Sequence, residues 1–208
     1  MHDKTRRLTY LTLFITIEVV ISIVPFLGFI PLGFINATTL HIPVILAGIL
    51  LSKRDGAIVG FVFGLLSFLK STFEPNMTSF LFSPFFSMGG IQGNFTSLII
   101  AFLPRILVGY MSGLIYEIAS RHLKEAMSVS ISAFIASFIF NTGLVMSLAY
   151  IFFRDAYALS QGLAQSAVLT AIVTVIFTSG IIEAIIAMII TLAIYKAAKK
   201  IMKGAPNV

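Results

Sequence analysis

The sequence predicts an all-α integral membrane protein with six transmembrane helices. Hydrophobic residues make up 58% of the chain and charged residues 11%, whereas about 25% of residues are charged in an average soluble domain. Long apolar runs alternate with short polar segments, and each membrane-spanning helix needs about 20 such apolar residues. The 208 residues therefore predict one transmembrane domain over 1–208, with little length left for a soluble domain.

The six helices are predicted from apolar runs between helix-breaking residues. Their expected ranges are 8–24, 39–52, 56–72, 96–120, 126–153 and 166–202. The second run is too short to cross a hydrocarbon core about 30 Å thick. We therefore expect the preceding outer segment, 25–38, to form a structured re-entrant loop that completes the crossing.

Basic residues predict which side of the membrane each helix end faces. Lysines and arginines gather at the same ends of the predicted helices: Lys4, Arg6, Arg7, Lys53, Arg54, Arg121, Lys124, Lys196, Lys199, Lys200 and Lys203. Lys70 and Arg154 stand at the opposite ends. The positive-inside rule then places both termini in the cytoplasm and the loops 25–38 and 73–95 outside the cell membrane. The net charge of +6 therefore fits the cytoplasmic rim of a protein in a lipid bilayer and requires no nucleic acid.

The sequence contains no pattern of catalytic or metal-binding residues. Cysteine is absent, and His2, His41 and His122 lack the spacing of metal ligands. Nucleotide-binding loops and hydrolase motifs are also absent. We expect no catalytic residue, no metal and no cofactor, so any ATP that drives transport must be hydrolysed by another chain.

Arg105 is the strongest candidate for a functional residue. It stands in the apolar run 97–109, and an arginine at the centre of a membrane helix costs about 2.5 to 3.5 kcal/mol on insertion scales. We expect its guanidinium to face a cavity, with Glu183 or a ligand group as its counterpart. A second interpretation stays open, because Pro104 can place Arg105 in the first turn of a helix, near the membrane surface.

The outer segment 73–95 combines amide and hydroxyl side chains with six phenylalanines and one charged residue, Glu74. Such a mixture suits a pocket for a small polar organic molecule, because apolar walls exclude water and a few polar groups fix orientation. A loop whose phenylalanines lie at the lipid headgroups explains the same composition. Both interpretations stay open.

Glycine recurs at every fourth residue in one predicted helix, at Gly56, Gly60 and Gly64. Small residues at this spacing let two helix backbones approach closely inside a membrane. The partner is either a neighbouring helix of the same chain or another subunit.

Four blocks of the sequence resemble the substrate-binding S components of energy-coupling factor (ECF) transporters: 33–48, 56–67, 82–85 and 103–109. The resemblance covers nearly all six predicted helices and is greatest to the pantothenate-specific type. It implies a subunit that captures a vitamin from outside and topples in the membrane. The implied partners are a transmembrane T component and two ATPase subunits.

The resemblance also suggests how the candidate residues bind a ligand. Pantothenate has a carboxylate, which Arg105 can bind as a forked pair, and hydroxyl and amide groups that suit asparagine side chains. Phenylalanines suit its dimethyl carbon. The predicted substrate-binding residues are Asn36, Thr38, His41, Asn76, Phe82, Phe85, Asn94, Arg105, Asn141 and Glu183.

One motif departs from the family pattern. Many S components dock on the T component through Ala-x-x-x-Ala on the first helix, where this chain has Thr12 and Thr16. Threonine is still small enough for close helix contact, so we expect these two residues to form the docking face.

Several alternatives compete with a pantothenate-binding S component. The same scaffold serves pyridoxine, hydroxymethylpyrimidine and riboflavin. A stand-alone proton-coupled carrier would use Glu18, His41 and Glu183 as a relay. A membrane enzyme would use Arg105, Glu117 and Glu183, and a ligand-free scaffold would leave Arg105 unexplained.

Overall fold

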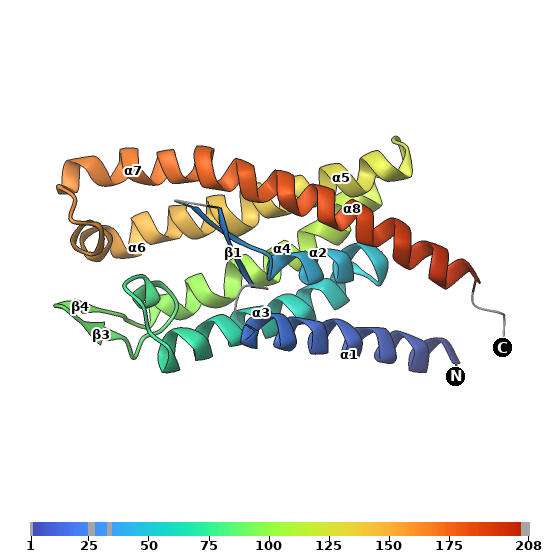
Figure 1. Cartoon of the computed structure of the whole chain (residues 1–208), viewed down its shortest axis with the longest axis horizontal. Helices are drawn as coiled ribbons and strands as arrows, with labels where there is room; N and C mark the ends of the chain where they lie inside the picture. Colours follow the sequence, from blue (N-terminus) through green and yellow to red (C-terminus); the bar gives the residue numbers. More distant parts are fainter. Residues whose placement is uncertain (1, 25–27, 33–34, 205–208) are drawn as a thin grey trace.

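The computed structural model describes the backbone of residues 2–24, 28–32 and 35–204, and the side chains of 4–24, 28 and 39–200. In this part the chain forms an elongated bundle of helices (Figure 1). The helices are α1 (His2–Ile23), α2 (His41–Leu50), α3 (Lys53–Phe73), α4 (Thr96–Ala119), α5 (Glu125–Ile135), α6 (Leu144–Gln161), α7 (Val168–Val175) and α8 (Ile181–Gly204). Two π-helical segments, η2 (Ala136–Gly143) and η4 (Ile176–Gly180), and two 3-10 turns, η1 (Ser79–Leu81) and η3 (Gln165–Ala167), complete the helical structure.

The described helices run in six stretches, because η2 joins α5 to α6 and η4 joins α7 to α8 without a break. Four of these stretches are long and apolar enough to cross a membrane: 53–73, 96–119, 125–161 and 165–200. The all-helical membrane fold is therefore confirmed. The additional crossings by α1 and by the short α2 stay a prediction.

The outer segment between α1 and α2 contains a β-hairpin that the sequence analysis did not predict. Strand β1 (Phe29–Leu32) pairs antiparallel with β2 (Ile35–Thr38), so that Phe29 lies opposite Thr38. The pairing satisfies backbone N–H and C=O groups within the segment. An irregular loop exposed to lipid would leave such groups without hydrogen bonds. The segment is therefore structured, whereas its re-entry into the membrane stays a prediction.

A second small hairpin lies between η1 and α4. It pairs β3 (Ser87–Met88) with β4 (Ile91–Gln92). Gly89 and Gly90 form its turn with φ angles of 61° and 80°, which glycine adopts without steric cost. The hairpin projects from the end of the bundle opposite to the one where α1 begins and α8 ends (Figure 1).

The fifth predicted helix was expected to end at residue 153, and this boundary is wrong. Phe153 has non-helical angles (φ −135°, ψ 27°) and marks a kink, but the helix continues to Gln161. The charged residues after the kink, Arg154 and Asp155, indicated the end of an apolar run and not the end of a helix. Gly162, at φ 62°, terminates it in the left-handed conformation, which is the usual role of glycine there.

Helices α2, α3 and α4 pack backbone against backbone. A Cβ atom on Gly56 would lie 2.3 Å from the carbonyl oxygen of Gly109, and one on Gly60 would lie 2.2 Å from that of Arg105. Gly64 faces the Ala101 carbonyl in the same way, at 2.8 Å. The structure thus sets all three glycines of α3 against α4, with no room for a side chain.

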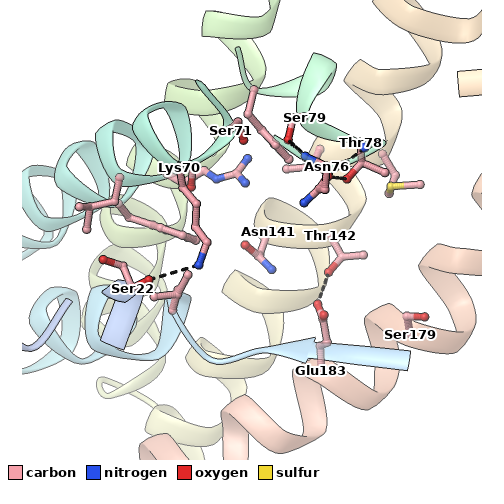
Figure 2. Close-up of a pocket in the computed structure, with 18 of the residues that line it drawn as sticks. Ser22, Lys70, Ser71, Asn76, Thr78, Ser79, Asn141, Thr142, Ser179 and Glu183 are labelled. Carbon is pink, nitrogen blue, oxygen red and sulfur yellow. Dashed lines mark hydrogen bonds between the residues drawn. The ribbon is translucent and has the colours of Figure 1, made fainter. Parts of the chain in front are cut away.

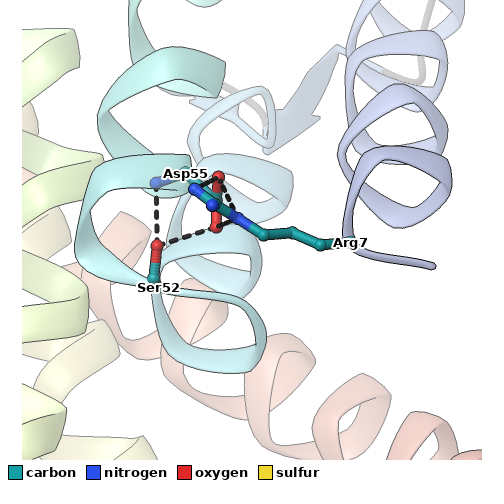
Figure 3. Close-up of polar contacts among 3 residues, drawn as sticks. All are labelled: Arg7, Ser52 and Asp55. Carbon is teal, nitrogen blue, oxygen red and sulfur yellow. Dashed lines mark hydrogen bonds and ion pairs between the residues drawn. The ribbon is translucent and has the colours of Figure 1, made fainter. Parts of the chain in front are cut away.

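An ion pair between the exposed Arg7 and the buried Asp55 attaches the beginning of α1 to α3 (Figure 3). The guanidinium of Arg7 donates to both carboxylate oxygens of Asp55, with Nη2 2.6 Å from Oδ1 and Nε 2.8 Å from Oδ2. Ser52 caps α3 by accepting from the Asp55 backbone N–H at 3.2 Å. Its hydroxyl also donates to Oδ2 at 2.7 Å. Such forked pairs fix geometry as well as adding energy, so they set the position of α1 at this end of the bundle.

Candidate functional site

A cavity of about 700 Å³ opens between α3 and α4 on one side and η2, η4 and α8 on the other. This volume is in the range of sites for small organic ligands, about 300 to 1,000 Å³. Polar groups on its surface include Ser22, Lys70, Asn76, Arg105, Asn141 and Glu183. Apolar walls between them come from α3, from Phe82 directly after η1, and from α6 and α7.

Arg105 lies in the third turn of α4, which begins at Thr96. Its side chain is buried, and Pro104 does not place it in the first turn of the helix. The depth of Arg105 in the membrane stays a prediction. The guanidinium donates from Nη1 to the carbonyl oxygen of Ile100, at 2.8 Å. Its Cζ lies 4.4 Å from the ring centre of Phe82 and 5.2 Å from that of Phe63.

The hydrogen-bonding capacity of Arg105 is far from used. Its Nε has no partner, and Arg105 forms no ion pair with any carboxylate among the residues that the structure describes. Aromatic faces attract a cation but do not neutralise it. A buried cation is costly without a counterion, so the cavity presents a site for an anionic group at this wall.

The opposite wall carries neutral hydrogen-bonding groups and a carboxylate. Asn141 and Thr142 come from η2, Ser179 from η4 and Glu183 from the first turn of α8 (Figure 2). The hydroxyl of Thr142 donates to Oε2 of Glu183, at 3.1 Å. This wall therefore combines donors and acceptors for hydroxyl and amide groups.

Both π-helical segments contribute to this wall. A π-helical turn is rare and is frequently found at functional sites. Asn141 and Glu183 were predicted from the sequence as binding residues, whereas Thr142 and Ser179 were not. A wider helical turn leaves no mark in the apolar pattern, so neither residue could be recognised from the sequence.

The loop between α3 and α4 forms the rim of the cavity. Lys70 Nζ donates to the backbone carbonyl of Ser22, at 3.3 Å, and so joins α3 to α1. Asn76 orders the next turn, because its Oδ1 accepts from the backbone N–H of Thr78 at 2.9 Å and from its hydroxyl at 2.8 Å. Lys70, which the sequence analysis used only to assign orientation, thus belongs to the site.

Some predicted residues lie elsewhere. The structure does not bring His41, Phe85 or Asn94 to the described lining of the cavity. His41 is buried in α2 with Nε2 3.0 Å from Ser137 Oγ. Phe85 is 71% exposed, and the side chain of Asn94 accepts from the Thr96 backbone at 2.8 Å at the start of α4. Two further predicted residues, Asn36 and Thr38, belong to β2, whose side chains are outside the described part.

The predicted docking residues lie on the exposed surface of α1. The hydroxyl of Thr12 donates to the Leu8 carbonyl and that of Thr16 to the Thr12 carbonyl, each at 2.9 Å. Both hydroxyls are thus satisfied within the helix, and only small apolar surface is left for a partner. Contact with another subunit at this face stays a prediction.

Two further observations bear on the alternative functions. Glu18 is fully buried in α1, and both of its carboxyl oxygens lack a hydrogen-bond partner, but it does not line the described cavity. In the part of the chain that the structure describes, no three acidic, histidine or cysteine residues gather as metal ligands.

The fold and the cavity together define a helical membrane protein with a binding site for a small solute. The whole-chain comparison is more specific. The family model described as "ECF transporter, substrate-specific component" matches residues 6–195. The chain therefore belongs to this family of transporter subunits.

Two curated relatives are similar over long stretches. The "Pantothenic acid transporter PanT" of Lactococcus lactis subsp. cremoris is 39% identical over 156 residues, covering 73% of this chain and 76% of the relative. The "Pantothenate transporter PanT" of Leuconostoc mesenteroides subsp. mesenteroides is 34% identical over 122 residues, covering 56% and 53%. Both relatives are named as transporters and not as enzymes.

Proposed function

We propose that this chain is the pantothenate-binding subunit of an ECF transporter. It captures pantothenate from outside the cell membrane and delivers it through a transmembrane T component that two separate ATPase subunits drive. The family match and the names of both relatives support this function.

Arg105 is the observation that carries the choice of ligand. Pantothenate is a monoanion, and the cavity presents one buried guanidinium whose Nε is unused. A carboxylate placed against Nε and a terminal nitrogen would form the forked pair that arginine makes with planar anions. The ring of Phe82 lies over the guanidinium, with its centre 4.4 Å from Cζ.

The opposite ends of the bundle support the direction of capture. The start of α1, the start of α3 and the end of α8 carry the basic residues and lie at one end (Figure 1). The loop that forms the cavity rim lies toward the other end. With the basic end in the cytoplasm, the cavity faces outside, and both termini are cytoplasmic.

Calorimetric titration of the detergent-solubilised chain with pantothenate tests the proposal. We expect one-to-one binding, and in Arg105→Ala a loss of more than about 2 kcal/mol of binding free energy, roughly 30-fold in affinity. Arg154→Ala is the matched control, because Arg154 is an exposed arginine that does not line the described cavity. Unchanged affinity in folded Arg105→Ala would remove Arg105 from the ligand site.

A panel of ligands separates the alternatives. Tight binding of riboflavin, pyridoxine or hydroxymethylpyrimidine in place of pantothenate would retain the transporter subunit and change its substrate. Pantothenate uptake into vesicles that contain this chain alone would instead indicate a stand-alone carrier. We expect uptake only after the T component and both ATPase subunits are added.

A further inference from the structure

The cavity has two chemically different walls. Arg105 on α4 and Lys70 on α3 supply the cations of the lining, with the exposed Glu74 following α3. Glu183 on α8 lies beside Asn141 and Thr142 (Figure 2). A ligand that spans the cavity therefore meets a cation at one end and a carboxylate at the other.

The carboxylate of Glu183 lines the cavity and accepts a hydrogen bond there. Its side chain is 8% exposed, and Oε2 accepts from the Thr142 hydroxyl at 3.1 Å. A carboxylate accepts hydrogen bonds at about four lone-pair positions, and Glu183 lines the cavity, where a ligand hydroxyl can donate to it. The adjacent Asn141 amide supplies both a donor and an acceptor.

The same arrangement opposes a second negative charge on the ligand. Two anions in a cavity with apolar walls repel each other more strongly than in water, because the surroundings screen them less. An anionic oxygen also cannot donate the hydrogen bond that a carboxylate requires.

We propose that Glu183 is a selectivity residue: it accepts a hydrogen bond from a hydroxyl at the end of the ligand remote from the carboxylate, and excludes ligands that are anionic at both ends. This inference rests on the proposed function. It assigns the hydroxyl-bearing end of pantothenate to the wall formed by Asn141, Thr142 and Glu183. It also predicts that the phosphate ester of the terminal hydroxyl is rejected, so that a phosphorylated form is not taken up.

The test compares three ligands with the purified full-length chain. They are pantothenate, its phosphate ester at the terminal hydroxyl, and its acetate ester at the same position, which adds bulk without charge. We expect the wild-type protein to bind the phosphate ester at least 100-fold more weakly than pantothenate. In Glu183→Gln we expect this ratio to fall at least tenfold, whereas the ratio for the acetate ester, which lacks only the donor to Glu183, falls much less.

Two further variants keep the result interpretable. Asp155→Asn removes a carboxylate outside the described cavity and makes the same change in net charge, so its ratio should equal that of the wild type. Asn141→Asp adds a carboxylate to the same wall and should increase the ratio of pantothenate affinity to phosphate-ester affinity. This variant tests the inference independently if Glu183→Gln does not fold.

Three results would overturn the inference. They are wild-type affinity for the phosphate ester within tenfold of that for pantothenate, an unchanged ratio in folded Glu183→Gln, and an equal fall of the ratio in Asp155→Asn. In each of these cases pantothenate still binds and the proposed function stands. Absence of pantothenate binding by the folded wild-type protein would instead overturn the proposed function, and this inference with it.

Discussion

The two walls of the cavity are built in different ways. Arg105 stands on a wall where α3 and α4 meet backbone to backbone, with Gly60 directly against the Arg105 carbonyl. Asn141, Thr142 and Glu183 stand on a wall where two π-helical segments meet through side chains, and Gly180 there faces the Thr142 side chain. Backbone contacts can move only together with their helices, whereas side chains can adjust singly.

This difference suggests a division of roles. The glycine-packed wall fixes the position of a single cation, which must meet a carboxylate at defined geometry. The π-helical wall presents several neutral groups that can adapt to hydroxyls and amides. Substitutions that add one methyl group to either wall test this comparison directly.

The largest effect is expected for Gly109→Ala. Its Cβ would lie 1.9 Å from the carbonyl oxygen of Gly56 and 2.3 Å from the carbonyl carbon. Neither atom can move without its helix, so we expect the free energy of unfolding to fall by about 3 kcal/mol, the upper part of the overpacking range. Thermal unfolding of the detergent-solubilised protein measures this as a lower midpoint, or as failure to recover folded protein.

Gly180→Ala is the matched change on the other wall. Its Cβ would lie 3.0 Å from Thr142 Cγ2 and 3.3 Å from Thr142 Cβ, and a shift of that side chain by a few tenths of an ångström relieves the contact. We expect a destabilisation below about 1 kcal/mol. Equal melting temperatures for the two variants would contradict the proposed difference between the walls.

A smaller effect, on binding, is expected for Gly60→Ala. The added methyl would lie 2.2 Å from the Arg105 carbonyl oxygen and would displace the backbone that carries the guanidinium. Binding groups must be held to within about 0.5 Å, so we expect pantothenate affinity to fall about tenfold, near 1.4 kcal/mol. Calorimetry on folded protein gives this value.

Gly64→Ala controls for a general loss of packing. Gly64 lies one turn further along the same contact between α3 and α4, which we call the seam. Its Cβ would lie 2.8 Å from the Ala101 carbonyl oxygen. It should lower stability but change affinity less than Gly60→Ala. If both variants lose affinity equally, the seam supports the whole cavity and not Arg105 in particular.

The same contrast explains which features were predictable from sequence. Arg105 was identified because a charge in an apolar run is conspicuous, and the glycines of α3 because their spacing matches the helix repeat. Ser179 and Thr142 were missed, because the π-helical turns that bring them to the cavity follow from tertiary packing and have no pattern in the sequence. His41 was selected as a polar residue next to an apolar run, and it proved to be buried with Ser137.

Helix boundaries show the same limit. Apolar length predicted the six helical stretches, but the hairpin of β1 and β2 depends on pairing between segments whose prolines and glycines also suit a loop. The continuation of α6 to Gln161 was missed because charge marks the end of an apolar run and not the end of a helix.

The smallest effect on binding is expected for Thr142→Val, which keeps the shape of the side chain and removes its hydroxyl. Glu183 then loses the donor at 3.1 Å, and a single hydrogen bond contributes about 1 kcal/mol, so pantothenate affinity should fall roughly fivefold. The double variant Gly60→Ala with Thr142→Val sharpens the comparison, because substitutions at sites without shared partners add. Additive losses of binding free energy would support two walls that act separately, whereas a coupling of more than about 0.5 kcal/mol would show that the ligand, or the packing between the walls, makes them one unit.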